Sequence, residues 1–256
     1  MGSALHLGKP IFRNMTITFQ SLTEQLTSQR ADGKTLVDLS LRTDTMFCQS
    51  VVSAGYLTQE QMQRAASRYR LGKSKDGAVV FWEIDEEQHI RDGKLMWYHD
   101  DCHRIKDKNP TWVTACLKKQ GELPSFFEPK RCLFGQHLLE TDRVVCVVEA
   151  EKTAVICSEL YPDYIWMAPG GLSMFSAAKL YPLRNHKVIL FPDTDLDGKT
   201  FKDWKEKCDA AQENFKYPIR ISRILEDHAT PDQKRRKIDL VDFLFEKSHY
   251  PPPIVP

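Results

Sequence analysis

Three stretches decide the fold: VVCVVEAEKTAVICSEL at residues 144–160, YIWMAPGG at 164–171 and KVILFPDTDLDGK at 187–199. Each contains a short, mainly apolar run, which is typical of a strand buried on both faces of a sheet. Strands are therefore predicted at 144–148, 164–168 and 187–191, and residues 219–224 would add a further strand.

Helical patterns separate these strands. Apolar side chains recur at helical spacing over 151–160, and Pro162 stops the run. Ser173 is predicted as the N-cap of a second helix that ends near Tyr181. A third helix is predicted at 199–214, with Phe201, Trp204, Cys208 and Ala211 along its apolar side. Strands that alternate with helices predict a mainly parallel sheet covered on both faces.

Three carboxylates follow the predicted strands: Glu149 after the first, and Asp193 and Asp195 after the third. In such sheets, ligands bind outside the carboxyl ends of the strands. A group of acids there would repel itself unless a cation neutralised it, and ligation by oxygen alone suits magnesium. One or two such ions can assist phosphoryl transfer.

A simpler explanation stays equally open from spacing alone. Acidic residues commonly follow strands as solvated loop residues, and Asp197 could cap the helix that begins near Lys199. The three carboxylates converge only if the order of the strands brings their ends together.

The same residues resemble the Toprim domain of bacterial and phage primases, topoisomerases and some nucleases. That family combines a strand ending in Glu, a glycine-bearing turn and a strand ending in Asp-x-Asp with a glycine soon after. The matching segments here are VVEAEKTA at 147–154, APGG at 168–171 and LFPDTDLDGK at 190–199. CLFGQHLL at 132–139 is similar to the helix that precedes Toprim in primases, and KIDLVDFL at 237–244 is similar to a later primase segment. One departure is Ala150, where the family often has glycine.

The resemblance implies roles for particular residues. Glu149, Asp193 and Asp195 would be catalytic and would bind Mg²⁺ or Mn²⁺, with Glu149 in an acid-base or metal-linked role. Asp239 is a weaker metal candidate, and capping of the helix before Leu240 is its alternative explanation. The residues expected to contact substrate phosphates or let the backbone approach them are Lys152, Gly170, Gly171, Gly198 and Lys199.

The expected fold class is α/β: a Toprim domain at 141–247 with a mainly parallel sheet flanked by helices, preceded by a smaller α+β subdomain. Residues 1–66 would be mainly helical, with Thr58 starting a helix. Residues 67–140 would form a β-rich unit with a hairpin at 77–85 and 92–98, resembling the subdomain that precedes Toprim in primase cores. Residues 248–256 would form an extended, proline-rich tail.

Charge balance, cysteine content and the absence of long apolar runs lead to expectations about nucleic-acid binding, zinc and cellular location. The 36 basic and 35 acidic residues nearly balance, so overall charge does not indicate a nucleic-acid binder. Local clusters, such as Lys130 with Arg131 and the basic run at 234–237, could bind phosphates or simply form solvated faces. The seven cysteines contain no C-x-x-C pair, so we expect reduced thiols and no zinc. No signal peptide or membrane-spanning stretch is evident, and a cytoplasmic location without membrane partners is expected.

The function expected from the resemblance is primase-like: magnesium-dependent nucleotidyl transfer on single-stranded nucleic acid, with nucleoside triphosphates as substrates and a separate helicase or replication protein as a possible partner. The source expected is a phage, plasmid or other mobile element. A Toprim nuclease that cleaves phosphodiesters is one alternative. A catalytically silent module that binds nucleic acid or a partner protein is another.

Overall fold

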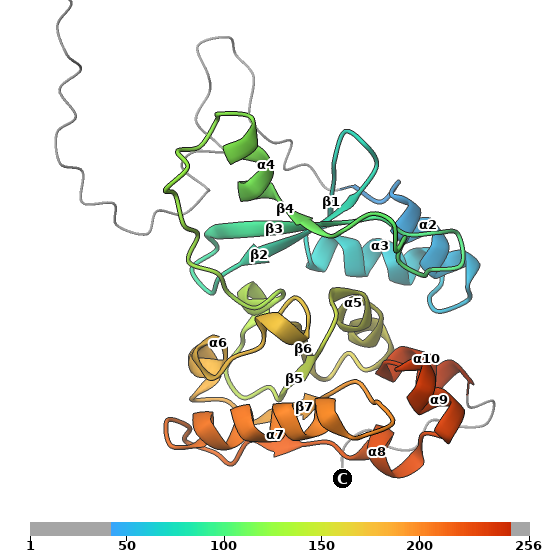
Figure 1. The fold of residues 1–256 in the computed structure, drawn as a ribbon, viewed down its shortest axis with the longest axis vertical. Helices are drawn as coiled ribbons and strands as arrows, with labels where there is room; N and C mark the ends of the chain where they lie inside the picture. Colours follow the sequence, from blue (N-terminus) through green and yellow to red (C-terminus); the bar gives the residue numbers. More distant parts are fainter. Residues whose placement is uncertain (1–41, 247–256) are drawn as a thin grey trace, which may run out of the picture.

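The computed structural model describes residues 42–246 (Figure 1). The expectations for the first 41 residues and for the proline-rich tail lie outside the described residues. The remaining chain forms two units, each built on a four-stranded sheet.

The N-terminal unit contains an antiparallel sheet in the order β1-β2-β3-β4. Its strands and helices are α2 (Met46–Ser53), α3 (Gln59–Arg68), β1 (Gly72–Lys73), β2 (Val79–Ile84), β3 (Ile90–Met96), β4 (Thr111–Trp112) and α4 (Val113–Lys119). The predicted helix start at Thr58 is confirmed, because its hydroxyl accepts a hydrogen bond from the Gln61 N–H and the Gln61 side chain accepts from Thr58 N–H. The predicted hairpin is β2 and β3, which pair over most of their lengths.

The C-terminal unit contains a parallel sheet in the order β6-β5-β7-β8. Its strands are β5 (Val145–Val148), β6 (Ile165–Met167), β7 (Val188–Phe191) and β8 (Arg220–Ile221). Its α-helices are α5 (Glu151–Leu160), α6 (Ala177–Leu180), α7 (Lys199–Gln212), α8 (Ile224–His228), α9 (Pro231–Arg236) and α10 (Leu240–Glu246). The predicted α/β fold, with a smaller α+β unit that precedes it in the sequence, is confirmed.

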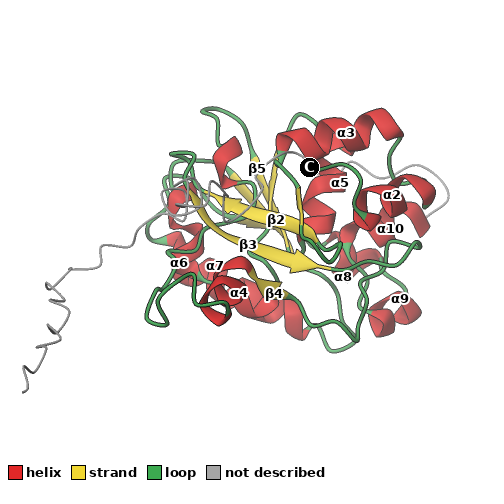
Figure 2. Cartoon of the chain, turned by 90° about the horizontal axis from the view of Figure 1, so that it is seen from above, coloured by secondary structure: helices red, strands yellow, loops and turns green. Residues whose placement is uncertain are grey.

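Both faces of the parallel sheet are covered, as its apolar strands require. Cys146 and Val148 of β5 point into a core shared with α5 and with the N-terminal unit, whereas Val145 and Val147 point into a core built with α6 and α7. Figure 2 shows β2 and β3 crossing above this sheet. The shared core fixes the two units against each other.

Several local predictions need correction. Ser176, rather than Ser173, caps the helix after the Pro-Gly-Gly turn, and that helix is the short α6. The Leu-Phe-Gly segment is not an α-helix: Phe134 pairs with Ala168 beside β6, and a single 3-10 turn follows at Gln136–Leu138. The last strand is only two residues long because the chain enters α8 at Ile224.

No helix within residues 42–246 combines the length and the apolar character that crossing a membrane would need.

Candidate functional site

The carboxyl ends of the parallel strands place the predicted residues along one edge of the sheet. Glu149 directly follows β5, and Asp193 follows β7 after Pro192. The Pro-Gly-Gly turn follows β6, and Gly171 N–H donates a hydrogen bond to the Glu149 carbonyl oxygen. Strand order therefore brings Glu149 between the turn and Asp193, as the sequence analysis required.

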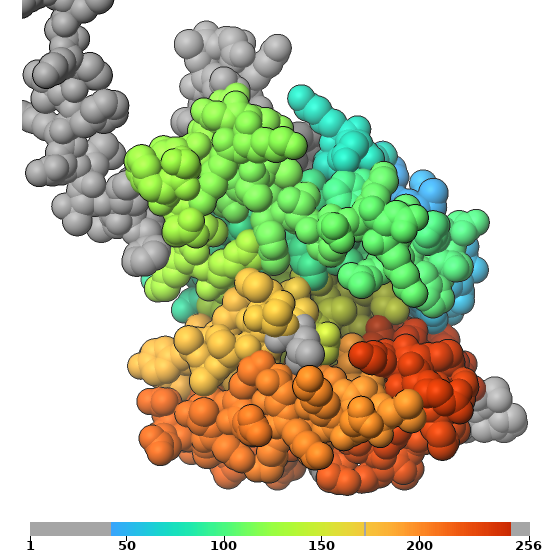
Figure 3. Space-filling model, viewed as in Figure 1, coloured from blue at the N-terminus to red at the C-terminus, as the bar shows by residue number. Residues whose placement is uncertain are grey.

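Asp193 lies in the wall of a cavity of about 650 Å³ between the two units. Figure 3 shows the N-terminal unit, in blue to green, meeting the C-terminal unit along a seam across the molecule. Burial, followed by the charges of Glu149 and Asp239, raises the pKa of Asp193 well above its usual range. The Asp193 carboxylate is therefore crowded by like charges in a poorly solvated position.

Asp239 and Asp242 bring two more carboxylates into the same cavity wall. They begin α10 with reciprocal hydrogen bonds: Asp242 N–H donates to Asp239 Oδ1 at 2.9 Å and Asp239 N–H donates to Asp242 Oδ2 at 3.3 Å. Thr153 also donates to Asp239 Oδ2 at 2.9 Å. The helix-capping explanation of Asp239 is thus confirmed for Oδ1, while Oδ2 is held by Thr153.

Lys152 supplies the positive charge for these two acids. Its Nζ lies 3.0 Å from Asp239 Oδ2 and 3.5 Å from Asp242 Oδ1, and its side chain is only 12% exposed. Burial opposes the charged form, but the two carboxylates raise the pKa of Lys152 well above its usual range. We call Glu149, Asp193, Asp239, Asp242 and Lys152 the acid-rich cluster.

Asp195 is used differently in this structure. Its Oδ1 accepts hydrogen bonds from the backbone N–H groups of Asp197 and Lys199, and its Oδ2 accepts from the Thr200 N–H and hydroxyl. Burial opposes ionisation, but these four bonds lower the pKa of Asp195. They occupy the four acceptor positions of a carboxylate. Asp195, and not Asp197, holds the start of α7 in this structure, and its predicted metal role stays a prediction.

The predicted glycines occupy backbone positions that favour glycine. Gly170, Gly171 and Gly198 have φ values of 96°, 116° and 61°, which place all three in or near the left-handed region. Gly198 forms the left-handed N-cap of α7. Lys199 is the first residue of that helix, and its side chain is exposed to solvent.

A second group of charges joins the Pro-Gly-Gly turn to the antiparallel sheet. Lys94 Nζ lies 3.0 Å from Glu151 Oε2 and donates to the Gly170 carbonyl at 2.8 Å. Lys179 Nζ donates to Glu83 Oε1 at 3.2 Å and to the carbonyl of Pro169 at 2.8 Å.

Arg131 completes this group. Its guanidinium lies 2.8 Å from Asp92 Oδ2 and stacks on the ring of Trp112. Arg131 was a candidate phosphate ligand from sequence, but in the structure it pairs with a buried acid. We call the six residues of this group the interface ion network: Glu83, Asp92, Lys94, Arg131, Glu151 and Lys179.

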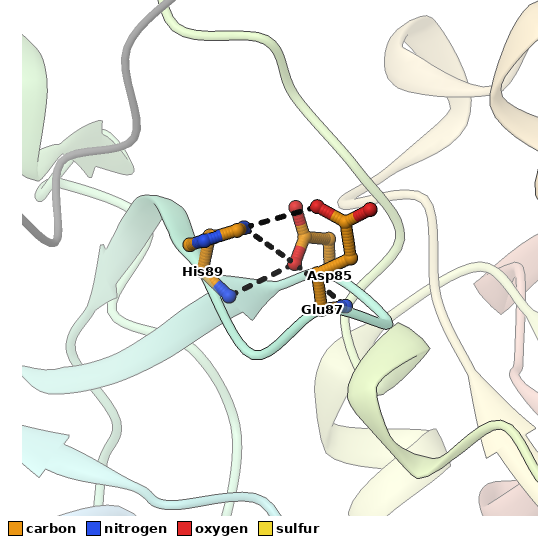
Figure 4. A group of neighbouring side chains, drawn as sticks. All are labelled: Asp85, Glu87 and His89. Atoms are coloured by element: carbon orange, nitrogen blue, oxygen red, sulfur yellow. Dashed lines mark hydrogen bonds and ion pairs between the residues drawn. The ribbon is translucent and has the colours of Figure 1, made fainter.

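A compact set of three possible metal ligands occurs once in the described part of the chain, and it lies elsewhere. Asp85, Glu87 and His89 gather at the turn between β2 and β3, with ligand atoms within 4.8 Å of one another (Figure 4). Asp85 is already paired with Arg91, and its Oδ1 accepts from the N–H groups of Glu87 and His89. The ion pair and the two hydrogen bonds explain why these three side chains gather at the turn.

The rim of the cavity beside the acid-rich cluster is basic and aromatic. Its exposed cations are Arg104, Lys106, Arg236 and Lys237. Tyr56 and Phe245 also line it, with ring centroids 4.9 Å apart, and Phe245 is 41% exposed.

The structure thus brings Glu149, Asp193, Asp239 and Lys152 together and leaves Asp195 in a separate role. The sequence analysis missed Asp242 as a site residue. Its signal was the Asp-x-x-Asp spacing, which puts two carboxylates on one face at the start of a helix. The interface ion network was also missed, although acidic and basic residues inside a predicted strand at 92–94 indicated it.

Comparisons with solved structures find primases, each with a TM-score below 0.5. The primase fragment of the bacteriophage T7 primase-helicase protein is 21% identical, with a TM-score of 0.44 over 68% of this chain, and the chain spans about 64% of that fragment. Primase domains bound to an RNA/DNA hybrid and dTTP, in a complex with the T7 lagging-strand DNA polymerase, are 22% identical, with a TM-score of 0.42 over 64% of this chain and 74% of the other. The zinc-binding and RNA polymerase domains of the Aquifex aeolicus primase are 11% identical, with a TM-score of 0.42 over 85% of this chain and 67% of the other.

No curated protein matches the chain in sequence. A family model described as "Domain of unknown function (DUF6371)" matches residues 46–194, which include β1 to β7 and end one residue after Asp193. Because this match covers more than half of the 256 residues, the chain belongs to the DUF6371 family.

Proposed function

We propose that this protein is a primase-like, metal-dependent nucleotidyl transferase that acts on single-stranded nucleic acid. The observation that carries the proposal is the acid-rich cluster. Glu149 and Asp193 follow neighbouring strands at the carboxyl edge of the parallel sheet, and Asp239 and Asp242 approach from the start of α10 with Lys152 as their ion-pair partner. Asp193, Asp239, Asp242 and Lys152 line a cavity that exposed cations also line. The motif resemblance supplies the reaction class.

The donor set fits Mg²⁺ or Mn²⁺. Asp193 and Glu149 offer carboxylate oxygens, the ligands that these hard cations prefer. A buried carboxylate beside a second carboxylate is unfavourable unless positive charge is added. Glu149 and Asp193 would hold the ion. When bound, the ion would supply ligation of phosphate oxygens and neutralise their charge.

The remaining residues of the cavity suit a nucleotide. The exposed cations Arg104, Lys106 and Lys237 would bind phosphate groups of the triphosphate or the strand. Tyr56 and Phe245 offer aromatic faces and edges for stacking of an unpaired base. Lys199, the exposed first residue of α7, remains a candidate for a further phosphate contact.

In the proposed reaction, a hydroxyl oxygen of one nucleotide attacks the α-phosphorus of a nucleoside triphosphate. A new P–O bond forms, the bond between the α- and β-phosphates breaks, and pyrophosphate leaves with its electron pair. The hydroxyl proton would pass to solvent or to a nearby base, a step in which Glu149 would assist. Positioning and charge neutralisation supply most of the catalysis in such reactions.

The test is a labelled single-stranded template incubated with nucleoside triphosphates and Mg²⁺. New or extended strands support the proposal. Shortened strands support the nuclease alternative, which would use the same carboxylates. Both activities should disappear in Asp193→Asn and in Glu149→Gln.

A specific observation also supports the catalytically silent alternative. Asp195 is occupied as a helix cap, and Lys152 already pairs with Asp239. This alternative would prevail if the wild-type protein neither extends nor shortens a strand and binds no Mn²⁺, while still binding single-stranded nucleic acid.

A further inference from the structure

The contacts of Lys152 bear on the number of divalent ions that the acid-rich cluster can hold. It belongs to the first turn of α5, directly after β5, and its ammonium reaches the two acids that begin α10. Both acids and the lysine line the same cavity as Asp193. The ammonium therefore sits among carboxylates where a second divalent ion could otherwise bind.

The ion pair between Lys152 and Asp239 is shielded from solvent. The side chains of Lys152 and Asp239 are 12% and 9% exposed. Asp239 is tied to α5 a second time through the Thr153 hydroxyl. A buried carboxylate that loses its cation must acquire another or become protonated. The ammonium of Lys152 meets this requirement without any ion from solution.

We infer that Lys152 takes the place of a second divalent cation, so that the acid-rich cluster binds one divalent ion, at Glu149 and Asp193, with the ammonium standing beside Asp239 and Asp242. The inference rests on the proposed function for the identity of the first ion. Sites that use two ions hold them about 3.5–4 Å apart between shared carboxylates. In this protein, the Lys152 ammonium would supply the second of these two positive charges.

The test is the number of Mn²⁺ ions bound per chain, measured by titration with detection of free Mn²⁺ by electron paramagnetic resonance. Lys152→Met removes the ammonium and keeps most of the side-chain volume, so it should bind one Mn²⁺ more than the wild-type protein. Lys152→Arg keeps the charge and should bind the wild-type number. Lys205→Met, on the exposed face of α7, controls for the general loss of a positive charge.

The outcome separates this inference from the proposed function. Equal Mn²⁺ numbers in Lys152→Met and Lys152→Arg would overturn the role of Lys152, even if the wild-type protein binds one ion and extends strands. A wild-type protein that already binds two ions at this site would also overturn it. A wild-type protein that binds none would overturn both this inference and the metal dependence of the proposed function.

A second measurement covers a variant that does not fold in metal-free buffer. In that case Mn²⁺ should restore folding of Lys152→Met, because a ligand that binds only the folded state stabilises it. The double variant Lys152→Met, Asp242→Asn has one carboxylate fewer and should lose that rescue. Failure of Mn²⁺ to restore the single variant would count against the inference.

Discussion

Two groups of charged side chains lie in the same region between the two units, and they differ in balance. The interface ion network matches three carboxylates with three cations, each acid within hydrogen-bonding distance of a basic partner. The acid-rich cluster matches four carboxylates with Lys152. The first group has the balanced charge of a structural joint, whereas the second group contains four acids and one lysine.

The contrast follows from the cost of burying charge. A buried ion pair adds little net stability, but a buried ion left without its partner is strongly unfavourable. Evolution of a stable interface therefore tends to pair every buried charge. We therefore expect the interface ion network to serve stability and the acid-rich cluster to serve ligand binding. The following predictions test that distinction.

Asp193→Asn should separate activity from stability in the acid-rich cluster. We expect strand extension to fall by more than about 1,000-fold, the upper range for loss of one group that stabilises transition-state charge. The melting temperature should stay the same or rise, because the variant removes one of several mutually repelling carboxylates. A stably folded variant that retains extension would contradict the assignment.

Lys94→Met should show the opposite pattern in the interface ion network. It leaves the Glu151 carboxylate, only 3% exposed, without the cation 3.0 Å away. Breaking such a buried pair costs about 3–5 kcal/mol of unfolding free energy, which urea denaturation would measure. Lys205→Met breaks the exposed pair with Asp209 and should cause no measurable change. Equal effects of the two substitutions would remove the contrast between buried and exposed pairs.

Glu83→Gln tests the interface ion network through the pH dependence of the unfolding free energy. Burial raises the pKa of Glu83 to about 7, although Lys179 and Arg131 partly oppose this. Between its unfolded pKa near 4.5 and about 7, the folded state holds the proton more tightly. Wild-type stability should therefore fall as pH rises through this window.

Glutamine at position 83 cannot titrate, so the stability of Glu83→Gln relative to wild type should rise by about 3 kcal/mol from pH 4.5 to pH 8. Urea denaturation across this range would measure the difference. Glu87→Gln, on an exposed side chain of the nearby turn, is the control and should track the wild-type curve. A flat difference between the Glu83 variant and wild type would show that Glu83 is ionised throughout.

Substitutions of Asp195 should give the smallest effect and test its place outside the acid-rich cluster. Asp195→Ala removes the acceptor for the first N–H groups of α7 and should cost about 1 kcal/mol. Asp195→Asn keeps one acceptor oxygen, which can hold two of the four hydrogen bonds, so it should lose less stability than Asp195→Ala. Thermal unfolding of both variants checks this. A loss of activity as deep as that of Asp193→Asn, in a stable Asp195→Asn protein, would instead support the prediction that Asp195 binds metal.

Much of the fold could be predicted because its signals are local. The run before Glu149 is apolar on both faces, the Pro-Gly-Gly turn interrupts the chain, and residues 199–212 bury Trp204 and Cys208 at helical spacing. Short elements were less predictable. The Leu-Phe-Gly segment is held by pairing with Ala168, a contact that its own sequence does not encode.

The roles of the charged residues needed the tertiary structure. Lys152 was predicted to contact substrate phosphates, and the structure adds that α10 brings Asp239 and Asp242 against it from 87 and 90 positions along the chain. Asp195 was expected beside Asp193, but the start of α7 offers its carboxylate four donors. For Lys152 and for Asp195, the same side chain would suit the predicted role and the observed contacts. Only the neighbouring residues distinguish the two.

The sequence by itself determined the parallel sheet and put Glu149 and Asp193 at its carboxyl edge, because strand periodicity and turn residues act over a few positions. Tertiary structure decided which acids meet and which are capped or paired. Those outcomes depend on Coulomb interactions and desolvation, which act through space between residues that the chain keeps far apart.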